Sequence, residues 1–221
     1  MSGVLYIYAI ADSPATPTGT GLHGAPLRRI RSGRLAALIS EHPRAPEPDE
    51  EVLWAHEQVV EELMSSGTVL PLRFGSSVER GEDLMTMLAE RREEFMDALE
   101  RVRGAVELSV RAELPVMPSA EAPLPRPRSG TAYLMERAEQ ERRERSAVEL
   151  VHRPLAALAR DSVAPALTHG VHQFKAAYLV DAGRVEDFGS RVGELNADLE
   201  GTRVTCTGPW PPYSFVTEGS R

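Results

Sequence analysis

The chain has 221 residues, of which 42% are hydrophobic and 26% are charged, and its formal net charge is −8. This length allows two small domains that each bury a core. The excess of acidic residues argues against a nucleic-acid partner, because a protein that binds nucleic acid needs a basic face to neutralise the phosphates. No apolar run approaches the roughly 18 residues that span a bilayer, and a single cysteine, Cys206, excludes an internal disulfide. We therefore expect a cytoplasmic protein without a membrane partner.

Residues 1–104 predict an N-terminal α+β domain that begins with β-strands. Val4–Ala11 mixes β-branched, aromatic and small apolar residues over the length of one strand. A stretch rich in Gly and Pro then predicts a loop. Two short strands follow at Leu27–Ile30 and Leu35–Ser40, and Ser32-Gly33 between them favours a hairpin turn.

The pattern then changes to helical spacing. Apolar residues recur on one helical face and predict a helix that starts near Pro48 and stops at Gly67. His56 lies on the same face. Thr68–Gly75 is short and β-branched, which predicts a strand. One long amphipathic helix follows and ends at Gly104.

Residues 105–207 predict a second domain with the element order β-α-β-β-α-β, the ferredoxin-like arrangement. Its expected elements are the strand Ala105–Leu114, a helix after Gly130 that is kinked or restarted at Pro154, the strands Val163–Thr168 and Phe174–Asp181, a helix over about Arg184–Leu199, and the closing strand Thr202–Thr207. Five prolines between Pro115 and Pro127 exclude a helix or central strand there and predict a mobile loop.

Residues 208–221 form a tail that contains the stretch GPWPPYSF. Three of the twelve aromatic residues of the chain, Trp210, Tyr213 and Phe215, lie in this stretch among three prolines. Because proline donates no backbone hydrogen bond, we expect the last strand to leave its ladder near Thr207. The aromatic side chains then either pack on one of the two domains or stay exposed as anchors for a partner.

Several patterns suggest chemistry, but each has a simpler explanation. Gly19–Gly24 spells GxGxxG, yet it follows its strand at a distance and Pro26 comes next instead of a helix, so we expect a loop. His56 lies on the apolar face of its helix, which favours a core or interface role. His169 and His172 could approach one metal ion, but no third ligand has a readable spacing, and a polar hairpin turn is favoured. We predict no catalytic residue, cofactor or metal.

Arg73 is the most informative charge, because it stands between Leu72 and Phe74 in a largely apolar stretch. An unpaired buried guanidinium is costly, so pairing within the fold is the favoured interpretation. Recognition of a partner is the second.

Four stretches together resemble one protein family. They are VLYIYAI at the N-terminus, HEQVVEELMSSGTVLPLRFGSSV in the middle, and FKAAYLVD followed by GPWPPYSF near the end. In this order they resemble the GvpL/GvpF family of gas vesicle proteins. The resemblance implies two α+β domains, a modified ferredoxin-like one at residues 1–104 and a ferredoxin-like one at 105–207.

The resemblance also implies a non-catalytic function in the cytoplasm and at the gas vesicle, a hollow protein shell. It implies an accessory or minor structural protein that binds the major shell protein and other gas vesicle accessory proteins and assists early assembly. Our candidates for partner contacts are Arg73, Trp210, Tyr213 and Phe215.

Two other functions are left open by the residues. One is an RNA-binding module, because split βαβ domains often display aromatic residues for base stacking; the absence of aromatic residues from Ala105–Leu114 argues against it. The other is a small-molecule enzyme that uses His56 or His169, which requires a concave pocket converging on those side chains.

Overall fold

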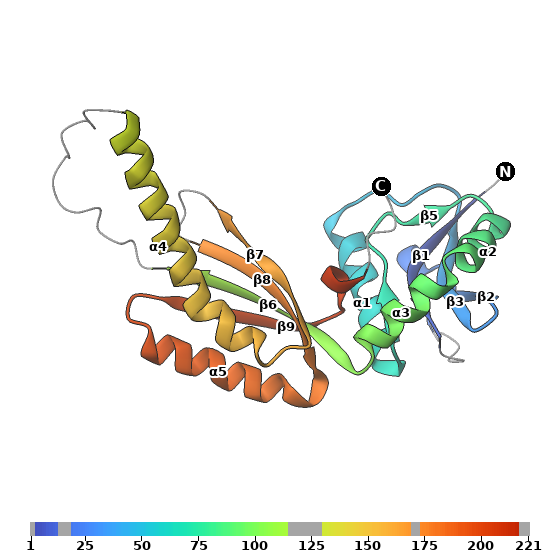
Figure 1. Ribbon diagram of the computed structural model, residues 1–221. Coiled ribbons are helices and arrows are strands. Elements are labelled where there is room, and N and C mark those ends of the chain that lie inside the picture. The colour runs from blue at the N-terminus through green and yellow to red at the C-terminus, as the bar shows by residue number, and fades with distance from the viewer. Residues whose placement is uncertain (1–2, 13–18, 115–129, 169–172, 217–221) are drawn as a thin grey trace. The chain divides into compact units, whose positions relative to one another are not determined.

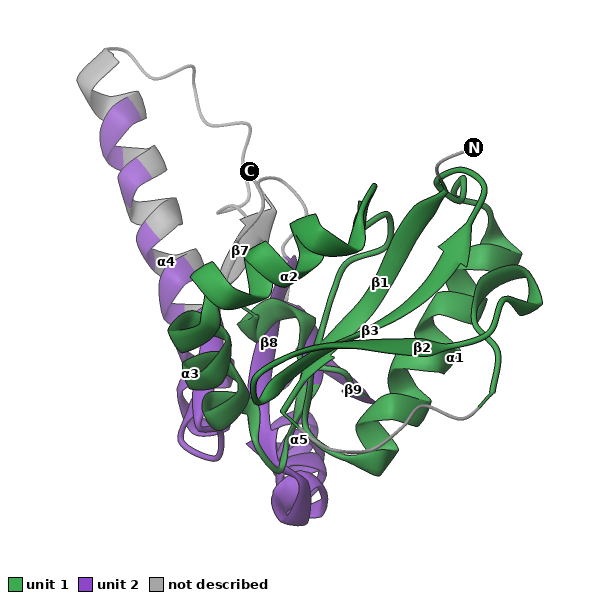
Figure 2. Cartoon of the chain, turned by 90° about the vertical axis from the view of Figure 1, so that its right-hand side faces the viewer, with its two compact units in different colours: residues 1–107, 210–221 green, residues 108–209 purple. Residues whose placement is uncertain are grey.

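The computed structural model describes residues 3–12, 19–114, 130–168 and 173–216. It consists of two compact units (Figures 1 and 2): unit 1 comprises residues 1–107 and 210–221, and unit 2 comprises residues 108–209. The chain therefore returns to unit 1 for its last residues. The prediction that independently folding domains end at residues 104 and 207 stays a prediction.

The strand β1 (Val4–Ala11) lies inside the five-stranded sheet of unit 1. The strand order is β2-β3-β1-β4, and β5 also pairs with β1. The other strands are β2 (Arg28–Ser32), β3 (Leu35–His42), β4 (Val69–Pro71) and β5 (Ser77–Val78). Six consecutive residues of β1, Tyr6–Ala11, are buried, so both faces of this strand are covered.

The predicted hairpin is confirmed, whereas the strand predicted over Thr68–Gly75 is too long. In the hairpin Ser32 pairs with Leu35, and Gly33 has a positive φ of 61°. After β4 the chain turns instead of staying extended, and the amide of Ser76 donates to the carbonyl of Arg73 at 3.2 Å.

Helix α1 (Glu50–Ser66) is bounded as its sequence predicts. The side chain of Asp49 caps its first turn by accepting a hydrogen bond from the amide of Val52 at 2.8 Å. Gly67 is the C-cap, and its amide donates to the carbonyl of Met64. The buried face of the helix carries the predicted apolar residues together with His56.

The long helix predicted up to Gly104 is in fact two helices, α2 (Gly81–Glu90) and α3 (Arg92–Val102). The break is at Arg91, whose backbone leaves the helical region with φ −102° and ψ 22°. Its guanidinium contacts the carboxylate of Glu94 at 2.6 Å and lies 4.7 Å from the ring centroid of Phe95. Both contacts hold this side chain over the first turn of the new helix.

Helices cover the two faces of the unit 1 sheet. Helix α1 packs against β1 and β4, and its buried residues share a core with Tyr6, Tyr8 and Leu38. Helices α2 and α3 contribute no residue to that core; α2 packs against β2 and β3, and α3 packs against β4. Figure 2 shows α1 on one side of the sheet and α2 and α3 on the other.

Unit 2 holds a four-stranded sheet in the order β7-β8-β6-β9. Its elements are β6 (Ala105–Glu113), α4 (Gly130–Ala156), β7 (Asp161–Thr168), β8 (Gln173–Asp181), α5 (Val185–Asp198) and β9 (Arg203–Trp210), and β6 begins within unit 1. This is the predicted β-α-β-β-α-β order. Both helices lie on one face of the sheet (Figure 1), and buried residues of each belong to its core. Helix α4 runs through Pro154 without a restart.

The last strand is longer than predicted. β9 continues to Trp210 through Pro209, three residues past Thr207, where we expected the ladder to end. Among the described strands, β9 lies at the edge of its sheet and has a neighbour on one side only. A residue without an amide hydrogen is tolerated where it would otherwise face that open side.

The two sheets share one strand order. When the strands of each unit are numbered in chain order, their spatial order in both sheets is second, third, first, fourth. Unit 2 has a helix between its first two strands, whereas the described residues of unit 1 hold only the 3-10 turn Leu22–Gly24 there. Unit 1 is thus a modified form of the same arrangement. In the described parts of the chain, no helix is both long and apolar enough to cross a membrane.

Candidate functional site

His56 lies in the core between α1 and the sheet of unit 1, where its exposed fraction is 1%. Its Nδ1 atom is 2.9 Å from the hydroxyl of Tyr6, and its Nε2 atom is 3.1 Å from the carbonyl oxygen of Leu72. The hydroxyl of Tyr213 is 3.2 Å from the same Nε2 atom. The rings of Tyr6, Tyr8 and Phe74 surround the imidazole at centroid distances below 6 Å.

These contacts define the protonation state of His56. A carbonyl oxygen can only accept, so Nε2 carries the proton that is shared between Leu72 and Tyr213. Nδ1 then accepts the hydroxyl proton of Tyr6. Burial lowers the pKa of His56 to about 4, with the hydrogen bond to Leu72 opposing the shift. The imidazole is therefore neutral at pH 7.

A neutral, enclosed imidazole with both nitrogens engaged has a structural role. A general base needs a lone pair that can reach a substrate proton, and the Nδ1 lone pair already accepts from Tyr6. The enzyme interpretation requires an open pocket that converges on His56, whereas this side chain is 1% exposed and enclosed by the core of unit 1. His169, the other histidine of that hypothesis, lies outside the described residues, as does His172, its partner in the candidate metal pair. Among the described residues, no group of three or more His, Cys, Asp or Glu could hold a metal ion.

The GxGxxG stretch contributes one residue, Leu22, to the core of unit 1. The amide of Leu22, which is fully buried, donates to the hydroxyl of Tyr8 at 2.8 Å. That hydroxyl is also 2.8 Å from Oγ of Ser40. A side chain at Gly21 would begin only 2.1 Å from the Tyr8 hydroxyl, which explains a glycine there. Leu22–Gly24 forms a 3-10 turn where a dinucleotide-binding motif requires the start of a helix, so the dinucleotide interpretation does not hold.

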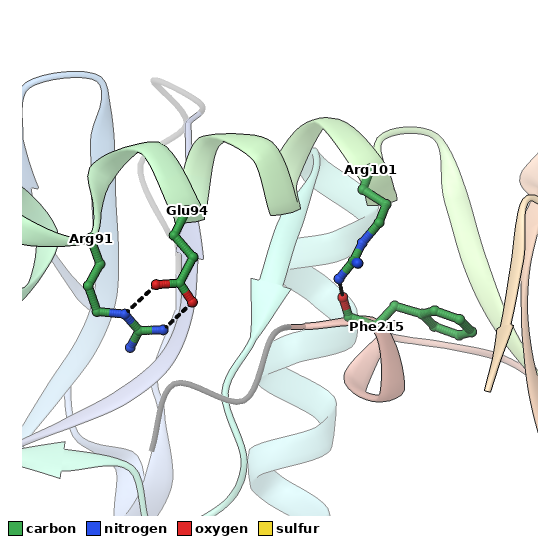
Figure 3. A network of polar contacts seen from close by, with 4 residues as sticks. All are labelled: Arg91, Glu94, Arg101 and Phe215. Atoms are coloured by element: carbon green, nitrogen blue, oxygen red, sulfur yellow. Dashed lines mark hydrogen bonds and ion pairs between the residues drawn. The ribbon is translucent and has the colours of Figure 1, made fainter. Parts of the chain in front are cut away.

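The aromatic tail packs on unit 1, to which it belongs. Tyr213 is partly buried against the core around α1, and Phe215 is only 3% exposed. The amide and the hydroxyl of Ser214 both donate to the carboxylate of Glu107, each at 2.8 Å. Arg101 on α3 donates to the main-chain carbonyl of Phe215, as Figure 3 shows beside the Arg91–Glu94 pair. Main-chain and side-chain contacts thus hold the tail.

Glu107, on β6, binds the tail through Ser214, a contact that the sequence did not predict. It is 8% exposed, and this burial raises the pKa of its carboxyl while the two hydrogen bonds from Ser214 lower it. Glu107 occupies a polar position in the alternating pattern of its strand, so the sequence did not indicate that its carboxyl is buried. Its partner lies 107 residues further along the chain.

The remaining predicted partner residues lie at the surface. Trp210, the last residue of β9, is 43% exposed. Arg73 lies in the turn after β4, and its side chain is exposed rather than buried in the fold. Among the four candidates, Tyr213 and Phe215 are thus engaged in packing, and Trp210 and Arg73 are accessible.

An open hollow on the outer side of α1 adds a candidate that the sequence reasoning missed. We call it the α1 hollow, and it is lined by Pro48, Asp49, Glu50, Glu51, Leu53, Trp54 and Glu57. Trp54 is 66% exposed and Leu53 is 43% exposed. Burial raises the pKa of Glu57, and its hydrogen bond with Tyr213 opposes this. Large apolar residues on the polar face of an amphipathic helix were the available signal.

The sheet of unit 2 lacks the features of an RNA-binding platform in its described part. Of the aromatic residues on its described strands, Phe174 and Tyr178 are fully buried in the core beneath α4 and α5, whereas Trp210, the last residue of β9, is exposed. One exposed ring at the end of a strand does not form a row of rings for base stacking. On β6, the positions that alternate with core residues are Ser109, Arg111 and Glu113. None of these offers a ring for base stacking.

Comparisons with known proteins agree with this architecture. Gas vesicle protein F of Streptomyces sp. (strain CB03234) is 32% identical over 235 residues, which cover 96% of this chain and 98% of that protein. Gas vesicle protein L of the same strain is 30% identical over 255 residues, which cover 96% of this chain and 92% of that protein.

Two solved structures share the fold. The crystal structure of the gas vesicle protein GvpF from Anabaena sp. PCC7120 matches with a TM-score of 0.85 and 22% identity, covering all of this chain and 98% of that one. GvpF from Microcystis aeruginosa matches with a TM-score of 0.80 and 18% identity, covering 98% of this chain and 99% of that one. The family model of the gas vesicle synthesis protein GvpL/GvpF matches residues 4–217. The chain therefore belongs to the GvpL/GvpF family of gas vesicle proteins.

Proposed function

We propose that the chain is a non-catalytic accessory or minor structural protein of gas vesicles, which binds the major shell protein and assists early vesicle assembly in the cytoplasm. The observation that carries this proposal is the family match over residues 4–217. Other gas vesicle accessory proteins are its further expected partners.

The geometry of unit 1 supports a binding role over a chemical one. The buried histidine has both ring nitrogens engaged, whereas the α1 hollow presents Leu53 and Trp54 to solvent. Exposed aromatic and aliphatic side chains in a concave surface are typical anchors for a protein partner. An assembly factor that holds apolar shell subunits before they polymerise needs such a surface.

Co-expression with the major shell protein of the same organism tests the proposal. We expect the affinity-tagged chain to retain the shell protein on a resin at physiological salt. A tagged, unrelated acidic protein of similar size is the control for non-specific capture. If both proteins are made and the shell protein is not retained above that control, the proposed function is wrong.

A further inference from the structure

We propose that the α1 hollow is the docking surface for a cationic amphipathic segment of the major shell protein. This inference rests on the proposed function and adds the place on this chain and the chemistry of the segment. It follows from the apolar floor of the hollow and from the charge around it.

The floor of the hollow is unusual for a helix surface. Trp54 exposes 66% of its surface and Leu53 exposes 43%, although α1 has a separate, fully formed buried face. Neither side chain is needed for the core that Val52, Val59 and Val60 make with the sheet. Tryptophan is one of the three residue types that are enriched among the hot spots of protein interfaces.

The rim of the hollow has one sign of charge. Asp49, Glu50, Glu51 and Glu57 line it. Seven acidic residues and no Lys or Arg occur between Arg44 and Arg73. In the described part of the chain, Glu50 and Glu51 take part in no ion pair, while Asp49 caps the helix. An unneutralised carboxylate rim attracts a cationic partner and repels an anionic one.

These two features together select the occupant. A segment with Lys or Arg beside large apolar residues can cover Trp54 and Leu53 while its charges meet Glu50 and Glu51. One face of a short amphipathic helix supplies that combination at i, i+3 and i+4 spacing. Phosphate-bearing partners, including RNA and anionic lipid surfaces, do not fit, because the carboxylates would repel them.

Substitutions in the hollow test the proposal in the co-expression capture assay. Trp54→Ala keeps a good helix former and is expected to reduce the captured shell protein at least about tenfold, as loss of a hot spot does. Met85→Ala is the matched control, because Met85 is a 49% exposed apolar side chain on α2, away from the hollow. It should leave capture unchanged.

The charge of the rim is tested separately. Glu50→Gln with Glu51→Gln is expected to weaken capture and to make it less sensitive to added salt. Glu61→Gln with Glu62→Gln removes the same charge from α1, about 16 Å further along the helix, and should have little effect. Far-UV circular dichroism and the melting temperature verify that all variants are folded.

The outcomes separate this inference from the proposed function. If the wild-type chain captures the shell protein and Trp54→Ala captures it equally well, the α1 hollow is not the docking surface, although the proposed function stands. If capture by the wild type grows with salt, the cationic assignment is wrong. If the wild type captures nothing, both the function and the docking surface are wrong.

Discussion

Replacing Phe215 by alanine is expected to lower the free energy of unfolding by about 3–5 kcal/mol, the range for truncating a buried aromatic side chain. Phe215 is 3% exposed, and its carbonyl accepts from Arg101. Its neighbour Ser214 is bonded twice to Glu107. Loss of the ring leaves a cavity and weakens the attachment of a segment that adjoins the His56 core through Tyr213.

Urea unfolding followed by tryptophan fluorescence measures this effect. The chain has two tryptophans: Trp54 lies on α1 of unit 1, and Trp210, the last residue of β9, lies in the tail that Phe215 holds. The signal therefore reports on unit 1 and on the attachment of the tail. Met85→Ala, at an exposed position, is the control and should change stability by no more than about 0.5 kcal/mol. A Phe215→Ala variant as stable as this control would contradict the packed position of the tail.

Acidification is expected to destabilise the fold through His56. Its pKa is about 4 in the folded chain and about 6.5 when unfolded. Between these values the unfolded state binds the proton and the folded state does not, so the free energy of unfolding falls as pH falls. The full loss is about 3 kcal/mol at pH 4, and above pH 6.5 this group contributes no pH dependence.

A His56→Gln variant isolates this contribution, because glutamine does not titrate. Its stability should lose the fall between pH 6.5 and 4 that the wild type shows. Glu57 and Glu107, whose pKa values are raised by burial, act in the opposite direction and remain in both proteins. An NMR titration of the wild type gives a second measurement. A His56 pKa near 6.5 in the folded protein would contradict the buried, neutral imidazole.

Much of the fold could be predicted because local patterns determine it. The composition of Val4–Ala11 indicates a strand of that length. The helix between Asp49 and Gly67 is bounded by an N-cap residue at its start and by a glycine at its end. The break at Arg91 could not be predicted from spacing. Leu88 and Phe95 are seven residues apart, close to two full helical turns, so the apolar pattern stays in phase across it.

The candidate site was predicted in part. The aromatic residues of the tail were identified from composition. The residues that hold the tail lie more than 100 residues away in sequence, and no local rule pairs them: His56 contacts Tyr213, Glu107 accepts from Ser214, and Arg101 donates to Phe215. The extension of the last strand to Trp210 depends on its position at a sheet edge, a property of the topology rather than of its prolines.

The α1 hollow was missed for a different reason. Helical periodicity predicts the buried face of α1, and Leu53 and Trp54 fall outside that face, so periodicity gives them no role. A search for large apolar residues on the polar side of each helix would have found them. Such residues point to a partner because the chain's own core does not use them.

Vesicle formation in a strain that lacks the gene for this chain tests the central claim most directly, with electron microscopy and buoyancy as the measurements. We expect no mature gas vesicles in that strain, restoration by the wild-type chain, and poor restoration by a stably folded Trp54→Ala variant. Vesicles of normal number and shape without the gene would contradict the claim that this protein acts in gas vesicle assembly.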